Sequence, residues 1–270
     1  MKKLLSVFTV SLLSFSTMAV EFFTPEPVFI AKVEKLVGSN AQNIKYFKAD
    51  YGLTGIGVVT PKYKKMVFYT NDSADYIVSG VLIDTQTVEN MTLKYSQDLD
   101  VDLTGITSDL EGLNHITQGN GEDVIYAVVD VNCGYCHQLW SEIQSIYKAN
   151  PTANLTVHWV PVGFLGEDSL NKAKSIASIE DNKSALDMLT KGMNRESLSS
   201  TPADKLRGQE RLKVNSNFMQ KNSFGGVPLV VSNIDGKWDI STGNPGKTFF
   251  NALKLKNKPT PILVSNDLAE

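Results

Sequence analysis

The chain contains two cysteines, Cys133 and Cys136, and two residues separate them. Neither thiol has any other cysteine in the chain to pair with. An apolar run, 124–129, precedes the pair, and a segment with helical spacing of apolar residues follows it. A Cys-x-x-Cys pair at a strand-to-helix junction makes one thiol acidic and reactive. The spacing therefore predicts a dithiol that exchanges with disulfides.

The two thiols have different predicted roles. Cys133 falls at the start of the expected helix, where unpaired N–H groups and the helix dipole favour negative charge. We assign Cys133 as the nucleophile and expect its sulfur to be exposed at the helix tip. Cys136 lies one turn further on, and we assign it as the buried resolving thiol that attacks a mixed disulfide and frees Cys133.

Neighbouring residues are predicted to support the pair. Gly134 and Tyr135 stand between the cysteines. His137 lies in the first turn of the same helix, where it stabilises the thiolate if protonated or is simply a solvated helix residue. Asp130, three residues before Cys133, either relays protons or caps the turn. The sequence leaves both pairs of alternatives open.

A second candidate element precedes a predicted strand, 227–231. Proline lacks an N–H group, so Pro228 suits the entrance of an edge strand. A cis Val227–Pro228 bond would turn the Val227 backbone toward the thiols and give a substrate a strand edge to pair with. Gly225 and Gly226 are consistent with a close backbone approach. We take Gly226, Val227 and Pro228 as candidate substrate-binding residues.

Two other chemistries also use this motif. A zinc site needs about four ligands. Beyond the cysteines, the histidines that could contribute are His115, His137 and His158. Their spacing does not suggest such a site, so we predict no metal.

The motif also satisfies Cys-x-x-Cys-His of covalent haem, with Met188 or Met219 as a far ligand. The preceding β run and the long sheet-rich chain disfavour haem, and we predict no cofactor.

The first residues have the order of a secretory signal peptide. Lys2 and Lys3 form a positive region, 4–13 is a short apolar stretch, and small residues near Ala19 predict cleavage after it. The apolar stretch is short for a membrane anchor. We therefore expect residues 1–19 to be a signal peptide and the protein to be periplasmic.

Charge disfavours one class of partner. The formal net charge is −3, and removal of two signal-peptide lysines takes −3 to −5. Arginine is scarce and no basic cluster is present. We therefore predict that the protein does not bind nucleic acid.

The elements around the pair divide the chain into two parts. Residues 20–103 combine one helix with short β segments, which predicts an antiparallel sheet with a helix packed on it. The predicted strands there are 55–60, 66–70 and 76–83. Residues 104–121 are polar and are predicted to be a linker with one short helix, 108–115.

Residues 122–256 run strand, helix, strand, helical block, hairpin, helix, which fits a thioredoxin fold with a helical insertion. Within the helical block, Thr201 and Pro202 predict a helix start, with Asp204 placed to complete its cap. The segment 233–236 predicts the turn of the hairpin. Residues 257–270 are expected to form a flexible tail.

Residues 130–137, Asp-Val-Asn-Cys-Gly-Tyr-Cys-His, resemble the active site of the periplasmic DsbC/DsbG disulfide isomerases. Gly226–Pro228 is similar to the cis-proline loop of that family, and Val78–Gly80 resembles part of its dimerisation domain. The resemblance covers nearly the whole chain after residue 19. It implies an α+β protein with an N-terminal cystatin-like dimerisation domain, a helical linker and a C-terminal thioredoxin-like domain. It also implies a V-shaped homodimer that acts on misoxidised exported proteins and is kept reduced by a membrane reductase of the DsbD type.

The chain departs from the family at two points. The family usually has threonine at the position of Val227. In having valine there, the chain resembles DsbA-type oxidants. A second, structural disulfide found in DsbC cannot form here. We therefore expect a disulfide isomerase or reductase, with a DsbA-like thiol oxidase and a holdase chaperone as alternatives.

Overall fold

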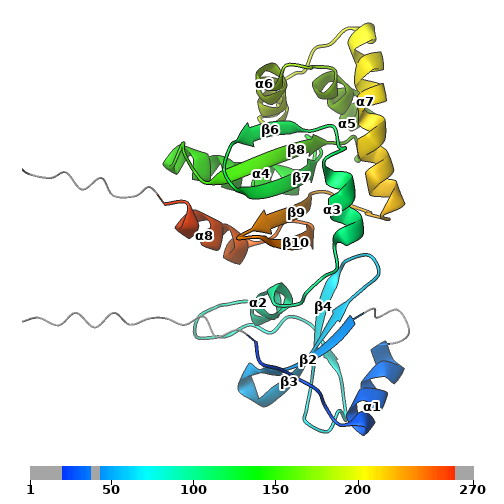
Figure 1. Cartoon of the computed structure of the whole chain (residues 1–270), viewed down its shortest axis with the longest axis vertical. Helices are drawn as coiled ribbons and strands as arrows, with labels where there is room; N and C mark the ends of the chain where they lie inside the picture. The colour runs from blue at the N-terminus through cyan, green and yellow to red at the C-terminus, as the bar shows by residue number, and fades with distance from the viewer. Residues whose placement is uncertain (1–19, 38–42, 259–270) are drawn as a thin grey trace, which may run out of the picture.

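The computed structural model describes residues 20–37 and 43–258, and within them the chain forms two units, each built on a five-stranded sheet (Figure 1). The predicted signal peptide, 1–19, and the last part of the predicted tail, 259–270, lie outside the described residues. No helix among the residues described is both long enough and apolar enough to cross a membrane.

The N-terminal unit is an antiparallel sheet with a helix on each face. Its elements in chain order are β1 (Phe22–Phe23), α1 (Pro27–Val37), β2 (Asn43–Ala49), the short 3-10 helix η1 (Asp50–Gly52), β3 (Leu53–Val59), β4 (Lys65–Thr70), β5 (Val78–Ser79) and α2 (Met91–Gln97). The strands lie in the order β1-β2-β3-β4-β5. The predicted antiparallel sheet with a helix packed on it is confirmed. The strand predicted over 76–83 is shorter, because only Val78 and Ser79 pair with β4.

Alternation along β2 explains how one sheet supports two helices. Successive side chains of a strand point to opposite faces. Tyr46 packs edge-on against Phe29 of α1 with ring centroids 5.7 Å apart, whereas Phe47 packs against Tyr95 of α2 at 5.0 Å. Each face of the N-terminal sheet therefore has its own apolar core.

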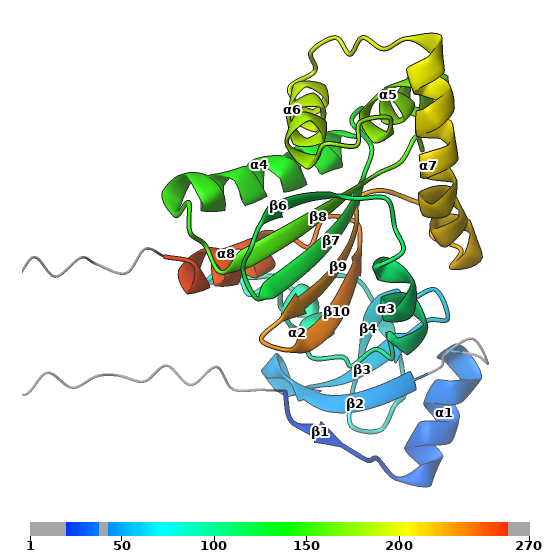
Figure 2. The same ribbon diagram turned by 45° about the horizontal axis from the view of Figure 1, so that its top comes forward.

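The C-terminal unit is a mixed sheet with helices on both faces (Figure 2). Its elements are α3 (Thr104–Leu110), β6 (Ile116–Gly119), β7 (Asp123–Val129), α4 (Gly134–Ala149), β8 (Leu155–Pro161), α5 (Glu167–Ala177), α6 (Asn182–Met193), α7 (Pro202–Lys221), β9 (Leu229–Ile234), β10 (Lys237–Thr242) and α8 (Lys247–Lys256). The strand order is β10-β9-β7-β8-β6, with β7 and β8 parallel and the other pairs antiparallel. The predicted order of strand, helix, strand, helical block, hairpin and helix is present, with α5–α7 between β8 and β9.

The segment predicted as a linker, 104–121, contributes secondary structure to the C-terminal unit. Helix α3 begins at Thr104, earlier than expected, and Ile106 and Leu110 are buried in the core of that unit. Strand β6 pairs antiparallel with the outer edge of β8. The four residues of β6 are too few to show an alternating pattern. Its pairing partner is also distant in sequence, because His158, which pairs with Thr117, lies 41 residues further along the chain.

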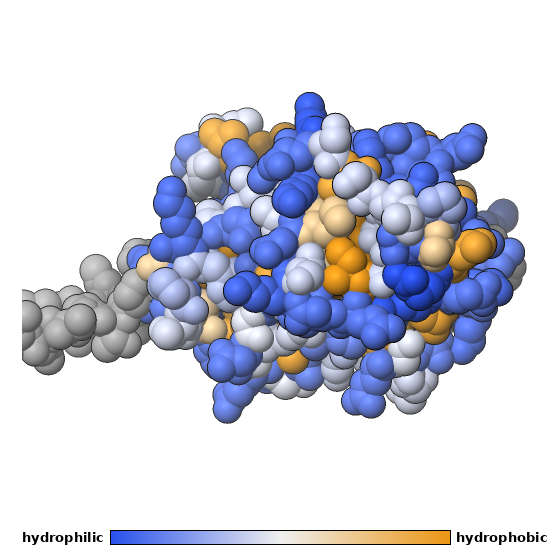
Figure 3. Space-filling model, turned by 90° about the horizontal axis from the view of Figure 1, so that it is seen from above, coloured by the Kyte–Doolittle hydropathy of each residue, from blue (hydrophilic) through white to orange (hydrophobic). Residues whose placement is uncertain are grey.

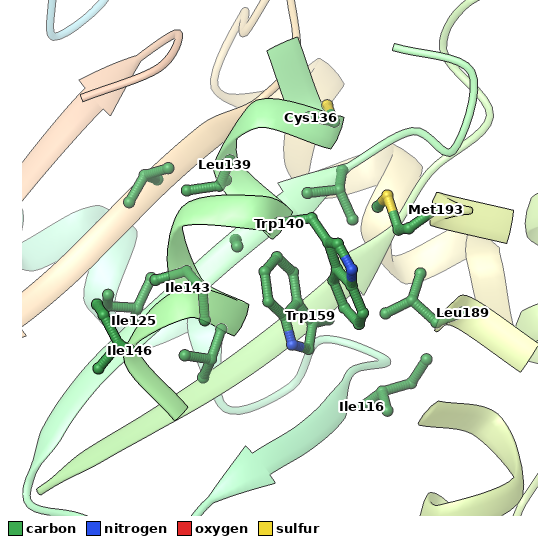
Figure 4. Packing of buried hydrophobic residues seen from close by; sticks show 14 of the residues in the cluster. Ile116, Ile125, Cys136, Leu139, Trp140, Ile143, Ile146, Trp159, Leu189 and Met193 are labelled. Atoms are coloured by element: carbon green, nitrogen blue, oxygen red, sulfur yellow. The ribbon is translucent and has the colours of Figure 1, made fainter. Parts of the chain in front are cut away.

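Helix α4 is fixed by a layer of apolar side chains (Figure 4). Its buried residues recur at helical spacing: Cys136, Leu139, Trp140, Ile143 and Ile146. Trp140 packs against Trp159 of β8 with ring centroids 4.7 Å apart. Leu189 and Met193 of α6 lie beside Trp140 in the same layer. The helical insertion is therefore packed directly against the helix that carries the cysteines.

Helix α7 is held at its start and near its middle. Thr201 and Asp204 form the predicted capping box, with Pro202 in the first turn. Asn215 is fully buried and donates to the carbonyl oxygens of Asn114 and Pro161, each over 2.9 Å. These bonds tie the insertion to the connection between α3 and β6 and to the end of β8.

The two units contact one another directly. Lys65 of β4 forms an ion pair with Asp239 of β10 at 2.5 Å, and the Lys65 side chain is only 10% exposed. Tyr63 packs near Phe224 with ring centroids 5.9 Å apart. These contacts join β4 and the turn before it to β10 and to the loop that precedes β9.

Candidate functional site

The two cysteines lie where β7 leads into α4. Cys133 is the N-cap residue of α4, and its N–H donates to the carbonyl oxygen of Asp130 over 3.0 Å. Both thiols are free. Cys136 is fully buried, as predicted, but Cys133 is only 6% exposed, so the expectation of an exposed sulfur is wrong. The reason is that the loop preceding β9 lies over it.

The Val227–Pro228 loop supplies the cover over Cys133. The peptide bond is cis, and the thiol of Cys133 donates to the carbonyl oxygen of Val227 with an Sγ–O distance of 3.5 Å. Gly225 and Gly226 are not required by a close contact within the chain, because a Cβ on either would meet nothing within 4 Å. The space beside this stretch of backbone is open, so another chain could approach it there.

Burial separates the two thiols chemically. Burial of Cys136 among apolar side chains raises the pKa of its thiol far above the ordinary range. Cys136 therefore holds its proton while the pair is reduced. Cys133 occupies the N-terminal position at which the helix dipole favours negative charge. The arrangement allows the Cys133 sulfur to attack a disulfide first and the buried Cys136 sulfur to attack afterwards.

Asp130 is a fully buried carboxylate that caps the turn. One of its oxygens accepts the N–H of Asn132 at 2.8 Å. The other accepts the N–H groups of Phe164 and Leu165 at 2.7 and 2.9 Å. These partners of the carboxylate are all backbone amides, which favours the capping alternative over the proton relay. Asp130 therefore fastens the loop after β8 to the cysteine turn.

Asn132 was not identified as functional from the sequence, yet it connects the cysteine turn to α5. Its side-chain amide donates to Asp168 at 2.8 Å and to the Ser169 hydroxyl at 2.9 Å. Lys172 donates to its side-chain oxygen at 2.9 Å. These partners lie between 36 and 40 residues further along the chain, so no local signal could reveal them.

The surface beside the cysteines is partly apolar. Tyr135, Phe164 and Leu165 are exposed, with Tyr135 at 64% and Leu165 at 54%. Seen from the side of the helical insertion, the surface is mainly hydrophilic, with apolar side chains gathered near the centre of the view (Figure 3). Gly134 is exposed, and a Cβ at this position would meet nothing within 4 Å.

His137 has both ring nitrogens engaged. Nε2 lies 2.7 Å from the carbonyl oxygen of Val131, and Nδ1 lies 3.4 Å from Nε of Arg195. An axial haem ligand needs a free ring nitrogen, so these residues do not fit the haem alternative. Among residues 20–37 and 43–258, no group of three or more histidine, cysteine or carboxylate side chains could hold a metal ion.

Comparison with known proteins gives remote structural neighbours. No protein-family model matches the chain, and no curated protein matches it. Proteus mirabilis ScsC in a transitional conformation is 18% identical with a TM-score of 0.46, over 60% of this chain and 82% of ScsC. The thiol-disulfide exchange protein alpha-DsbA2 from Wolbachia pipientis is 14% identical with a TM-score of 0.45, over 57% and 91%. A periplasmic thioredoxin-like protein from Salmonella enterica serovar Typhimurium is 18% identical with a TM-score of 0.44, over 59% and 98%.

Proposed function

We propose that the protein is a periplasmic thiol:disulfide oxidoreductase that reduces or isomerises the disulfides of misoxidised exported proteins. The observation that carries the proposal is the position of Cys133. Its sulfur lies at the start of α4, 3.5 Å from the Val227 carbonyl oxygen, with the buried thiol of Cys136 one turn below. The backbone beside Val227 offers an extended substrate segment a place to pair while its disulfide meets Cys133.

The reaction begins when the Cys133 thiolate attacks one sulfur of a substrate disulfide. The substrate S–S bond breaks, a mixed disulfide with Cys133 forms, and the second substrate sulfur leaves as a thiolate. In isomerisation, a substrate thiolate attacks the mixed disulfide and returns Cys133 as a thiolate. In reduction, Cys136 attacks the Cys133 sulfur, the bond between Cys133 and the substrate breaks, and the proton of Cys136 ends on the departing substrate sulfur; the substrate leaves as a thiol and a Cys133–Cys136 disulfide remains. A membrane reductase of the DsbD type would then restore the dithiol.

The test is recovery of activity from a scrambled protein with several disulfides. We expect the reduced protein to accelerate recovery and the Cys133→Ala variant to lose that effect. Absence of isomerase and reductase activity, or equal activity in the variant, would contradict the proposal.

We propose that the protein acts as a homodimer joined through the N-terminal unit. Strand β5 has one neighbour, β4, among the described residues, so its other edge is available for pairing. Exposed apolar side chains gather in this part of the chain: Tyr76, Val78, Val81, Ile83 and Val88. We expect a dimer in sedimentation equilibrium and a monomer after Val81→Asp. A wild-type protein that stays monomeric at concentrations well above those of the activity assay would contradict this proposal.

The alternative function is that of a DsbA-like oxidase, and Val227 is the observation in its favour. Its backbone contacts Cys133, and it carries no hydroxyl beside the sulfur. The redox state of the pair in the periplasm separates the two functions. A mainly oxidised pair that does not respond to loss of the membrane reductase would favour oxidation. Aggregation suppression that survives loss of both thiols would instead favour a holdase chaperone.

A further inference from the structure

The loop over the candidate nucleophile is held at its two ends. Leu229, the first residue of β9, is buried and pairs with β7. Phe224, at the other end, is also buried. Gly225 and Gly226 lie between them, and a Cβ on either would meet nothing within 4 Å. Because nothing packs against the glycines, the position of Val227 on this side depends on how firmly Phe224 is held.

The end of α7 places the backbone of Phe224. The N–H of Ser223 donates to the carbonyl oxygen of Gln220 over 3.0 Å, and the N–H of Phe224 donates to that of Met219 over 2.9 Å. Ser223 has a left-handed backbone with φ of 55°. These are the two bonds of a Schellman motif, which ends a helix and turns the chain. The motif fixes the backbone of Phe224, and packing must fix its ring.

The ring of Phe224 is packed from both units of the protein. Phe218 of α7 lies against it with ring centroids 5.7 Å apart, and Tyr63 of the N-terminal unit lies against it at 5.9 Å. The side chains of Tyr63 and Val227 both pack against the apolar cluster that contains Phe224. The N-terminal unit therefore contributes directly to the packing at the base of the loop over Cys133.

The turn before β4 holds Tyr63 in an unfavourable backbone conformation. Its φ is 59°, in the left-handed region that glycine and asparagine occupy more readily than a bulky aromatic residue. Two backbone bonds fix the turn: the N–H of Tyr63 donates to the carbonyl of Thr60 over 2.9 Å, and the N–H of Thr60 donates to that of Lys64 over 3.0 Å. A tyrosine at this position is unfavourable for the turn itself, and what its ring adds is the contact with Phe224.

We propose that Tyr63 is a positioning residue through which the N-terminal unit holds the substrate-pairing loop over Cys133. This inference rests on the proposed function, because it requires a substrate that pairs with the backbone beside Val227. Loss of the Tyr63 ring removes one of the two aromatic contacts of Phe224 and lets the span before Val227 move. A looser loop must be ordered when a substrate binds, which weakens binding. Attack by Cys133 within the bound complex is unchanged.

The first experiment measures, in single turnover, how fast the reduced full chain opens a disulfide in an extended peptide at increasing peptide concentration. Tyr63→Asn removes the ring and suits the left-handed backbone, so the turn should still form. We expect the half-saturating peptide concentration to rise roughly two- to tenfold, the range of an aromatic pair, with the maximal rate unchanged. Tyr63→Phe keeps the ring and should retain the wild-type value.

The matched control is Tyr51→Asn. Tyr51 is another tyrosine of the N-terminal unit with a left-handed backbone, with φ of 63°. It is 61% exposed, however, and its hydroxyl donates to Asp84 of the same unit. We expect the wild-type half-saturating concentration in this variant. Equal values for the wild type and Tyr63→Asn, or an equal rise in Tyr51→Asn, would overturn the inference.

The second experiment measures backbone motion at Gly225 and Gly226 by nitrogen-15 relaxation in the reduced protein without substrate. We expect lower order parameters in Tyr63→Asn than in the wild type and Tyr63→Phe. Unchanged order parameters would overturn the inference. If the wild-type protein does not open the peptide disulfide at all, the proposed function fails, while the relaxation data still decide whether Tyr63 holds the loop.

Discussion

Cys133 and Val227 are 94 residues apart in the chain, yet the sulfur of one lies 3.5 Å from the carbonyl oxygen of the other. The contact forms because β9, which follows the Val227–Pro228 loop, pairs with β7, which leads to Cys133. A sheet pairing thus brings the candidate nucleophile and the candidate substrate-binding backbone together. Replacement of the residues that hold this arrangement should therefore change the chemistry of the site or the stability of the fold.

The two thiols should behave differently when each is removed. Cys136→Ala leaves Cys133 able to attack but removes the thiol that resolves the mixed disulfide, so covalent complexes with substrate should accumulate. Cys133→Ala should form none, because the remaining thiol is fully buried and keeps its proton. Non-reducing electrophoresis with mass spectrometry checks this. Complexes of equal yield through Cys136 in the Cys133→Ala variant would reverse the assigned roles.

Replacement of Asp130 should destabilise the fold as well as the site. Asp130→Ala leaves the amides of Asn132, Phe164 and Leu165 without their buried acceptor. Unsatisfied buried groups that had a charged partner are costly, so we expect a loss on the order of 3 kcal/mol in the free energy of unfolding. Urea denaturation measures it. Asp130→Asn keeps one acceptor oxygen and should lose less; equal losses would show that the capping bonds contribute little.

Replacement of Gly208 by alanine should destabilise the C-terminal unit, and the same replacement of Gly105 serves as its control. A Cβ at Gly208 of α7 would lie 1.8 Å from the backbone oxygen of Lys174 in α5, so the two helices must separate. We expect Gly208→Ala to cost roughly 2–3 kcal/mol in unfolding free energy. Gly105 of α3 has nothing within 4 Å, so Gly105→Ala should be neutral or stabilise by up to about 1 kcal/mol. Thermal melting of both variants tests this, and equal melting temperatures would contradict the close helix crossing.

His158 should make stability depend on pH. Burial, with a smaller contribution from His115, lowers the pKa of His158 to about 4. Its ring packs against those of His115 and Tyr126, and Nδ1 contacts the Thr117 hydroxyl. An unfolded histidine has a pKa of ~6.5, so the folded protein binds fewer protons below that pH. Stability from this group is therefore present above pH ~6.5 and is lost as pH falls toward about 4.

The check on His158 is the urea midpoint measured at several pH values. Carboxylates titrate over part of the same range, so the quantity that matters is the difference between the wild type and His158→Gln. We expect the urea midpoint of His158→Gln to fall less than that of the wild type between pH ~6.5 and about 4. Parallel curves for the two proteins would show that His158 does not contribute.

Local pattern was enough to predict several elements. Apolar residues three and four apart predicted α4, and Thr201, Pro202 and Asp204 predicted the start of α7. The turn at 233–236 predicted the β9–β10 hairpin. In each case the signal lies within a few residues, because helix faces, caps and tight turns are local. The order strand, helix, strand, helical block, hairpin, helix predicted for residues 122–256 is present in the structure.

Features that depend on distant pairing could not be read from local pattern. The contact of Cys133 with Val227 joins residues 94 positions apart, and the contact of His137 with Arg195 joins residues 58 positions apart. Strand β6 is defined by its pairing with β8 and not by its own four residues. The identity of the N-terminal unit as a cystatin-like dimerisation domain stays a prediction, as do the individual roles of the site residues.

The pairing of β6 with β8 has a consequence for dividing the protein. A fragment that begins at residue 122 would lack both β6 and α3, leaving the backbone of β8 as an open edge and uncovering the apolar surface that Ile106 and Leu110 bury. Such a fragment would be prone to associate through that edge. The natural point of division is ahead of Thr104, so a fragment meant to keep the C-terminal unit intact should include residues 104–121.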